Sequence, residues 1–240
     1  MIPEFPVTGL HEGSRTPRSR DARLVVLMAG VVATALTWGA GEAALGQFQP
    51  KATGNLAMGP LHGSIAPEET NRTEVKNAAL AYGLQGAILG LMLGLAGAAA
   101  RGSVRAAFPA GLTGLLVGGM GGAGAARGLL SILQQVVERD PGQMLPPLLM
   151  HAGVCALIGA SAGLAFGLGM GGGRVPRAVI GGLVGAVLGA VVYQVIGALF
   201  LPLAETYRPL ASTGTARFLA HASVNNFIAV LVALTAAGRP

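Results

Sequence analysis

Glycine recurs at every fourth residue in four apolar stretches of this 240-residue chain. A spacing of four places such residues along one face of a helix, where the missing side chains allow a second backbone to approach closely. We call each set a glycine ladder; the four are Gly86, Gly90 and Gly94; Gly114, Gly118 and Gly122; Gly159, Gly163 and Gly167; and Gly181, Gly185 and Gly189. Because a glycine inside a helix costs about 1 kcal/mol in water, the ladders are typical of helices that pack in a bilayer.

The lengths of the apolar stretches also indicate a membrane protein. The chain is 52% hydrophobic and 11% charged, whereas an ordinary soluble domain is roughly 25% charged. A helix needs about 20 apolar residues to cross the hydrocarbon core of a bilayer. We therefore predict an all-α, multi-pass transmembrane bundle with glycine-zipper packing and one membrane domain over residues 24–238. Its six spans are expected at about 24–46, 77–100, 108–136, 148–172, 178–201 and 218–237.

Residues 1–23 are predicted to form a disordered basic tail, since they contain four arginines and few apolar residues. An arginine-rich start followed by an apolar run also resembles a cleaved signal peptide. The apolar core of a signal peptide is usually about 7–15 residues long and is followed by a small-x-small cleavage site. The first apolar run here is longer and has no clean site after it, so a retained helix is favoured and cleavage is the alternative.

The distribution of charge predicts the orientation of the spans. Nine cations and three acids fall on the side of the N-terminus, and six of each fall on the opposite side. Cytoplasmic loops carry an excess of lysine and arginine, so both termini are expected in the cytoplasm. Arginine outnumbers lysine 14 to 2, which with the abundant alanine and glycine favours a bacterial cytoplasmic membrane. The cations lie in tails and turns, so no nucleic-acid partner is expected.

Part of the chain is repeated. The segment from His151 to Val154 resembles that from His221 to Val224, 70 residues later, and Asn77 begins a similar segment earlier in the chain. We interpret the unit as helix, outer loop and helix, used two or three times. Units with an even number of spans keep their orientation, so an axis along the membrane normal would relate them.

One motif resembles a soluble cofactor site. Gly119 to Gly124 matches GxGxxG, and Glu138 follows at a distance suited to a ribose contact. A dinucleotide fold would need a strand boundary just before Glu138, where no turn residue stands, and further βαβ units, which do not follow. The same residues fit one continuous span, so no cofactor is predicted.

Other catalytic patterns are missing from the sequence. The single cysteine, Cys155, cannot form an internal disulfide or a CxxC site. The chain contains no Walker loop or HExxH motif. We therefore expect no catalytic residue, no metal site and no enzymatic activity.

Two charges fall inside the predicted spans. Glu42 is the nineteenth residue of the first span and Arg127 the twentieth of the third, which gives them similar depths. Because an isolated charge in the bilayer is costly, we expect them to pair, and Gln194 occupies the matching place in the fifth span. The three residues are a candidate polar cluster lining a solute path; the alternatives are a structural pair or two side chains that separately reach the interface.

A second polar group is predicted on the outer side. Its members are His151 and His221 at the starts of two spans, and Asn225 and Asn226 one turn deeper. Two histidines without a third ligand make a weak metal site, so interfacial hydrogen bonding is favoured over metal binding or titration. The asparagines are expected to point towards a partner helix or a water-filled vestibule.

Two functions follow from these patterns. The favoured one is a non-enzymatic assembly or interaction protein, whose glycine-rich helices pack in the lipid bilayer as a homo-oligomer or with other membrane subunits. The alternative is a small-solute transporter or channel with a polar path near Glu42, Arg127 and Gln194.

Overall fold

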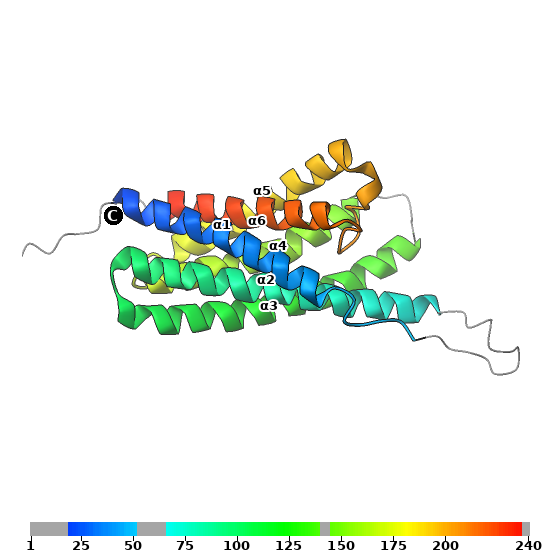
Figure 1. The fold of residues 1–240 in the computed structure, drawn as a ribbon, viewed down its shortest axis with the longest axis horizontal. Helices are drawn as coiled ribbons and strands as arrows, with labels where there is room; N and C mark the ends of the chain where they lie inside the picture. The colour runs from blue at the N-terminus through cyan, green and yellow to red at the C-terminus, as the bar shows by residue number, and fades with distance from the viewer. Residues whose placement is uncertain (1–18, 52–65, 140–144, 237–240) are drawn as a thin grey trace, which may run out of the picture.

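The computed structural model describes residues 19–51, 66–139 and 145–236, which fold into helices without any β-strand. Six long helices run roughly along one common axis (Figure 1). They are α1 (Ser19–Ala44), α2 (Pro67–Arg101), α3 (Val104–Arg139), α4 (Leu145–Gly169), α5 (Val175–Phe200) and α6 (Gly214–Thr235), with the 3-10 turn η2 (Pro202–Ala204) after α5. Each of the six long helices contains a stretch long and apolar enough to cross a membrane. The predicted all-α bundle of six spans is confirmed.

Several helices extend beyond the predicted apolar spans. Helix α2 begins at Pro67, ten residues before the predicted start, and its first turns carry the exposed ion pair of Glu68 with Arg72. Helix α1 begins at Ser19, so the last residues of the predicted tail are helical, and residues 1–18 lie outside the described residues. The first turns of α1 and α2 are polar, so a prediction based on apolar runs places the starts of these helices too late.

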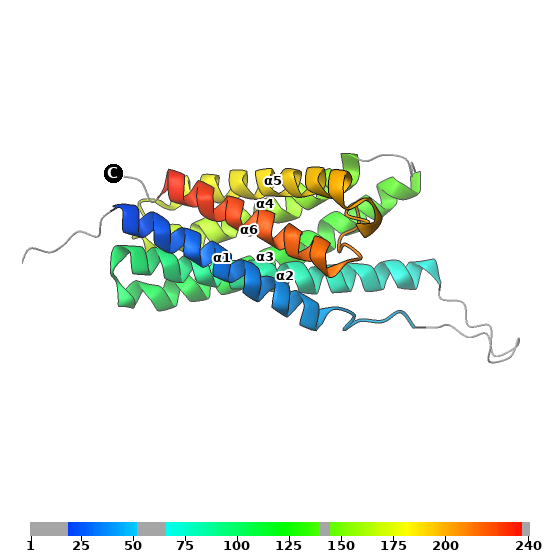
Figure 2. The ribbon, with the colours of Figure 1, turned by 45° about the horizontal axis from the view of Figure 1, so that its top comes forward.

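The helices form a closed ring. Each packs against the next along the chain, α1 also packs against α6, and α2 also contacts α4. Figures 1 and 2 both show α1 alongside α6, although these helices are farthest apart in the sequence. The GxGxxG segment lies within the continuous helix α3, as predicted for a span.

Glycines bring the helix backbones together within the chain. A Cβ atom added to Gly86 would overlap the backbone of Gly118, and one added to Gly90 would overlap that of Gly114. Between α4 and α5, Gly159 meets Gly182 in the same way. The fourth ladder on α5 meets the backbone of α6, where a Cβ at Gly185 would stand 2.6 Å from the carbonyl oxygen of Phe227. All four ladders are therefore in contact with other helices of the same chain.

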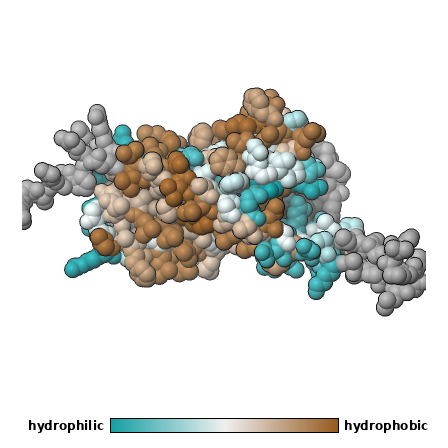
Figure 3. Space-filling view, viewed as in Figure 1, coloured by the Kyte–Doolittle hydropathy of each residue, from teal (hydrophilic) through white to brown (hydrophobic). Residues whose placement is uncertain are grey.

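The two ends of the bundle differ in chemistry. At the arginine end, short turns join α2 to α3 and α4 to α5, with the left-handed Gly102 ending α2. The arginines at these turns are Arg101, Arg105, Arg174 and Arg177. At the opposite end, which we call the cavity end, residues 201–213 form a longer loop between α5 and α6. On the face in Figure 3, apolar residues dominate the half that contains the start of α1, and hydrophilic residues gather towards the other end.

Candidate functional site

A partly open cavity of about 50 Å³ lies between the helices towards the cavity end. The walls come from five helices, and the loop 201–213 contributes Pro209, Leu210 and Ala211. The polar side chains on the walls are Glu42, Asn77, Tyr82, Gln85, His151, Tyr193, Arg217 and His221. This volume holds a few water-sized groups or a very small solute.

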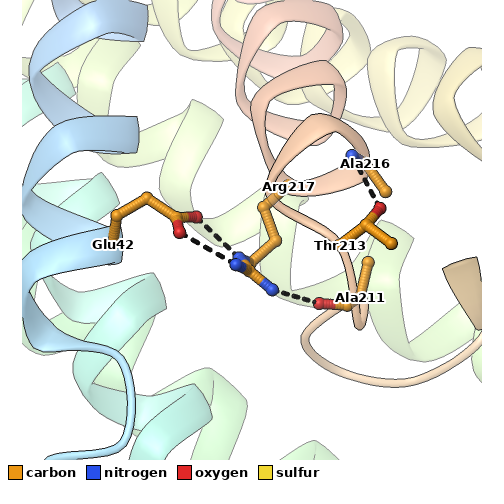
Figure 4. A network of polar contacts seen from close by, with 5 residues as sticks. All are labelled: Glu42, Ala211, Thr213, Ala216 and Arg217. Carbon is orange, nitrogen blue, oxygen red and sulfur yellow. Dashed lines mark hydrogen bonds and ion pairs between the residues drawn. The ribbon is translucent and has the colours of Figure 1, made fainter.

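An ion pair between α1 and α6 forms one wall of the cavity (Figure 4). The Nε atom of Arg217 donates to Oε1 of Glu42 at 2.6 Å, and Nη2 donates to Oε2 at 2.8 Å. The third guanidinium nitrogen, Nη1, donates to the carbonyl oxygen of Ala211 at 2.7 Å. Such two-point pairing fixes the geometry of both side chains, so Arg217 ties α1, α6 and the loop together.

The start of α6 explains how Arg217 reaches this position. The side chain of Thr213 caps the helix by accepting a hydrogen bond from the backbone N–H of Ala216 at 3.3 Å. Helix α6 therefore begins at Gly214 rather than at the predicted residue 218, and Arg217 stands in its first turn. The sequence prediction missed Arg217 because it was assigned to a loop, although Thr213 before the helix is a recognisable capping signal.

The predicted pairing of Glu42 with Arg127 is wrong. Helix α1 packs against α2 and α6, whereas Arg127 is exposed on α3 and lines a separate surface groove. Two residues at equal depth on different helices can pair only if their side chains point towards each other. Those of Glu42 and Arg127 do not. Glu42 found its partner on α6 instead.

Gln194 joins His151 rather than Glu42. The Nε2 atom of Gln194 lies 3.2 Å from Nδ1 of His151 and donates to the carbonyl oxygen of Thr206 at 3.1 Å. The same histidine nitrogen lies 2.9 Å from the carbonyl oxygen of Pro147, and the ring contacts that of Tyr193. Gln194 was predicted to join Glu42 and Arg127, and His151 was predicted to belong to the outer polar group. The structure thus links these two predicted groups.

His221 has an unpartnered nitrogen beside the cavity. Among the buried side-chain nitrogen and oxygen atoms of the described residues, only Nδ1 of His221 lacks a hydrogen-bond partner. Buried polar groups in proteins are almost always satisfied by protein or by ordered water. His221 lines the cavity, and its Nδ1 atom is a buried polar atom without a partner.

A chain of buried amides and hydroxyls lies next to the cavity. Asn225 is fully buried, accepts from Nε2 of Gln85 at 3.0 Å and donates to Oγ1 of Thr37 at 3.1 Å. These two bonds join α2, α6 and α1. The half-buried Asn226 donates to the carbonyl oxygen of Ala222 and to Oγ1 of Thr34. Both asparagines point to partners within the bundle, as expected for polar groups in a membrane.

The loop and a group of buried side chains border the cavity towards the two ends of the bundle. Towards the cavity end, Tyr82 on α2 donates to the carbonyl oxygen of Pro209 at 3.0 Å, which holds the loop over the opening. Towards the arginine end, Leu89, Ile158 and Phe166 are fully buried and fill the space between the helices. The site is a partly open pocket, with Glu42 on its wall 31% exposed.

No three His, Cys, Asp or Glu side chains are grouped to hold a metal in the part of the chain that the structure describes. A comparison of the chain with protein-family models, with curated proteins and with solved structures finds no match. The arrangement of the cavity is therefore the basis for a functional proposal.

Proposed function

We propose that the protein is a non-enzymatic small-solute carrier, which binds a small polar solute in this cavity. The observation that carries this proposal is a small cavity between five helices, whose mostly apolar walls include the charged pair Glu42 and Arg217 and the side chain of His221. One carboxylate and one guanidinium, Glu42 and Arg217, line the cavity and neutralise each other. A site without net charge favours a neutral or zwitterionic solute over an ion.

The internal repeat supports the same proposal. Asn77, His151 and His221 begin the three similar segments of the sequence, and all three side chains line the cavity. We infer a three-unit repeat whose axis passes through the cavity. Solute sites in membrane carriers commonly lie at the interface between repeated units. In this proposal the arginine end faces the cytoplasm, following the bias of positive charge.

Assembly of several chains is the second candidate. The glycine ladders act in our proposal as zippers within one chain, because they contact other helices of that chain. The ladders therefore do not support the homo-oligomer that the sequence suggested. The feature that favours assembly is the exposed stripe of Gly124 and Gly128 on α3, where an added Cβ would meet nothing within 4 Å.

Access of small molecules to the cavity tests the proposal. In a Cys155→Ala background, His221→Cys and Leu93→Cys are compared for reaction with a small water-soluble thiol reagent. We expect the cavity thiol to react at least tenfold faster than the thiol at the fully buried Leu93. Arg217→Gln should raise the rate at residue 221 further, because it releases the loop from α1 and α6. Arg72→Gln, which breaks an exposed ion pair away from the cavity, is the matched control.

Transport is measured in liposomes containing the purified full chain. We expect faster entry of at least one small neutral or zwitterionic solute among urea, glycerol and glycine than in protein-free liposomes. The variant Gln85→Leu, which alters a cavity wall, should reduce that entry. Equal thiol reactivity at residues 221 and 93 in the Arg217→Gln background, together with no solute entry above the protein-free rate, would reject the carrier and leave assembly as the better proposal.

A further inference from the structure

We propose that a groove on the outside of the bundle binds one anionic phospholipid. This lateral groove is separate from the cavity described above and runs between α1, α2 and α3. It consists of two surface depressions of about 330 and 490 Å³, which share Phe48, Leu80 and Leu84. The shared walls make the two depressions one continuous feature.

The walls of the lateral groove suit an acyl chain. Ala40, Ala43 and Ala44 of α1 face Leu80 and Leu84 of α2 across it. These short and apolar side chains leave room beside the helices, which hydrocarbon can fill in a bilayer.

Two cations give the groove its specificity. Lys76 and Arg127 are both exposed and line the same depression, and no acidic residue of the described part of the chain lines either depression. Within the described residues, the side chains of these two cations make no hydrogen bond or ion pair. Two uncompensated positive charges at one site are complementary to the negative charge of a lipid phosphate.

The depth of the cations matches the level of lipid headgroups. Arg127 lies 23 residues after Val104, where α3 begins at the arginine end, and Lys76 lies 25 residues before the end of α2. At 1.5 Å per residue these positions are roughly 35 Å from the arginine end, whereas the hydrocarbon core is only about 30 Å thick. The apolar walls at Ala40 and Leu84 lie nearer to the hydrocarbon core. A phosphate between the two cations would therefore place its acyl chain along the groove.

The proposal distinguishes an anionic lipid from a zwitterionic one. Phosphatidylglycerol brings a net negative charge to the two cations, whereas phosphatidylcholine brings an ammonium group together with its phosphate. A cation near a membrane surface contributes about fivefold to the attraction of an anionic lipid. Removing both cations should therefore weaken phosphatidylglycerol binding about 25-fold.

Native mass spectrometry of the full chain in detergent tests this, with both lipids carrying the same acyl chains. The wild type should retain phosphatidylglycerol in preference to phosphatidylcholine. The double variant Lys76→Gln/Arg127→Gln should lose that preference, and Arg127→Lys, which keeps the charge, should retain it. The matched control Arg72→Gln/Arg208→Gln removes two exposed cations outside the groove and should bind like the wild type.

Each contrary result overturns the proposal. Equal retention of the two lipids by the wild type would show that the cations select nothing, and an equal loss in the control would show a general effect of net charge. Displacement of phosphatidylglycerol by excess inorganic phosphate would mean that the site recognises phosphate rather than lipid. Should the double variant fail to fold by circular dichroism, Leu84→Trp fills the groove and leaves both cations in place. This variant should reduce retention of both lipids, and unchanged retention would reject the groove as the binding site.

Discussion

The two halves of the bundle hold the same helices together in different ways. Towards the arginine end, the contact of α2 with α3 is made by glycines, such as Gly90 against Gly114, which let one backbone touch another. Towards the cavity end, where Gly122 still lies against the backbone of Tyr82, side chains add links through the Glu42–Arg217 pair and the amide of Asn225. In lipid the hydrophobic effect does not drive helices together, so close packing and interhelical hydrogen bonds stabilise their association.

The difference has a consequence for function. Backbone contact excludes both water and side chains, so the glycine-packed half is closed. Polar side chains of different lengths cannot fill space as completely, and the cavity lies among them. The half that is held together by polar groups is thus also the half with room for a solute.

Adding a single methyl group should break the glycine-packed half. In Gly90→Ala the new Cβ would collide with the backbone of Gly114, which is part of a helix and cannot turn aside. Overpacking of this kind costs typically 1–3 kcal/mol, and we expect a loss of unfolding free energy near the upper end, about 3 kcal/mol. Reversible unfolding in a detergent titration, followed by the fluorescence of the single tryptophan Trp38, measures it.

Gly124→Ala is the matched control, because it makes the same change on α3 where nothing lies within 4 Å. Its stability should stay unchanged or rise by up to about 1 kcal/mol, the difference in helix propensity. Equal losses in the two variants would mean that close backbone contact is not what stabilises α2 against α3.

The period of four in the sequence singles out some of the glycines that meet another backbone, whereas Gly97 and Gly182 do so outside the ladders. Gly86, Gly90 and Gly94 share a helix face whatever the fold, because 3.6 residues make one turn. The partners of that face depend on how the helices are arranged around the bundle, which residue spacing does not encode. The backbone approach of Gly86 to Gly118 links α2 to α3, across the boundary between two of the proposed repeat units.

Removing one buried amide should weaken the polar half by less. Asn225→Leu keeps roughly the same volume but leaves Gln85 and Thr37 without their partners on α6. Hydrogen bonds between membrane helices contribute about 0.6 kcal/mol on average and at most about 1.7, so we expect a loss of about 1.5 kcal/mol for the two bonds. The same unfolding titration measures the change.

Asn226→Leu serves as the comparison for this prediction. Its shorter bond, at 2.7 Å, goes to the carbonyl of Ala222 in its own helix, and its bond to Thr34 is long at 3.4 Å. We expect a loss of less than about 0.5 kcal/mol. If the two asparagine variants lose the same unfolding free energy, the interhelical hydrogen bonds of Asn225 do not stabilise the bundle more than the bonds of Asn226 do.

The candidate site was only partly predictable from the sequence. The inward direction of Asn225 followed from the cost of placing an amide in lipid. The pairing of Glu42 depended on the position of α6 beside α1 and on four extra residues at the start of α6, which Thr213 caps. The loop that covers the cavity has no periodic pattern, so its hydrogen bonds to Tyr82 and Gln194 could not be read from residue types.

The smallest expected effect separates the two candidate partners of Glu42. A double-mutant cycle of Glu42→Gln with Arg217→Gln should give a coupling energy of about 1 kcal/mol, the upper range for a pair that water partly reaches. The two side chains are 31% and 13% exposed, so water screens them only in part. The parallel cycle with Arg127→Gln, whose side chain lies on α3, should give a coupling below about 0.3 kcal/mol. Stronger coupling to Arg127 than to Arg217 would reverse the assignment, and would mean that the ion pair does not tie the loop and α6 to α1.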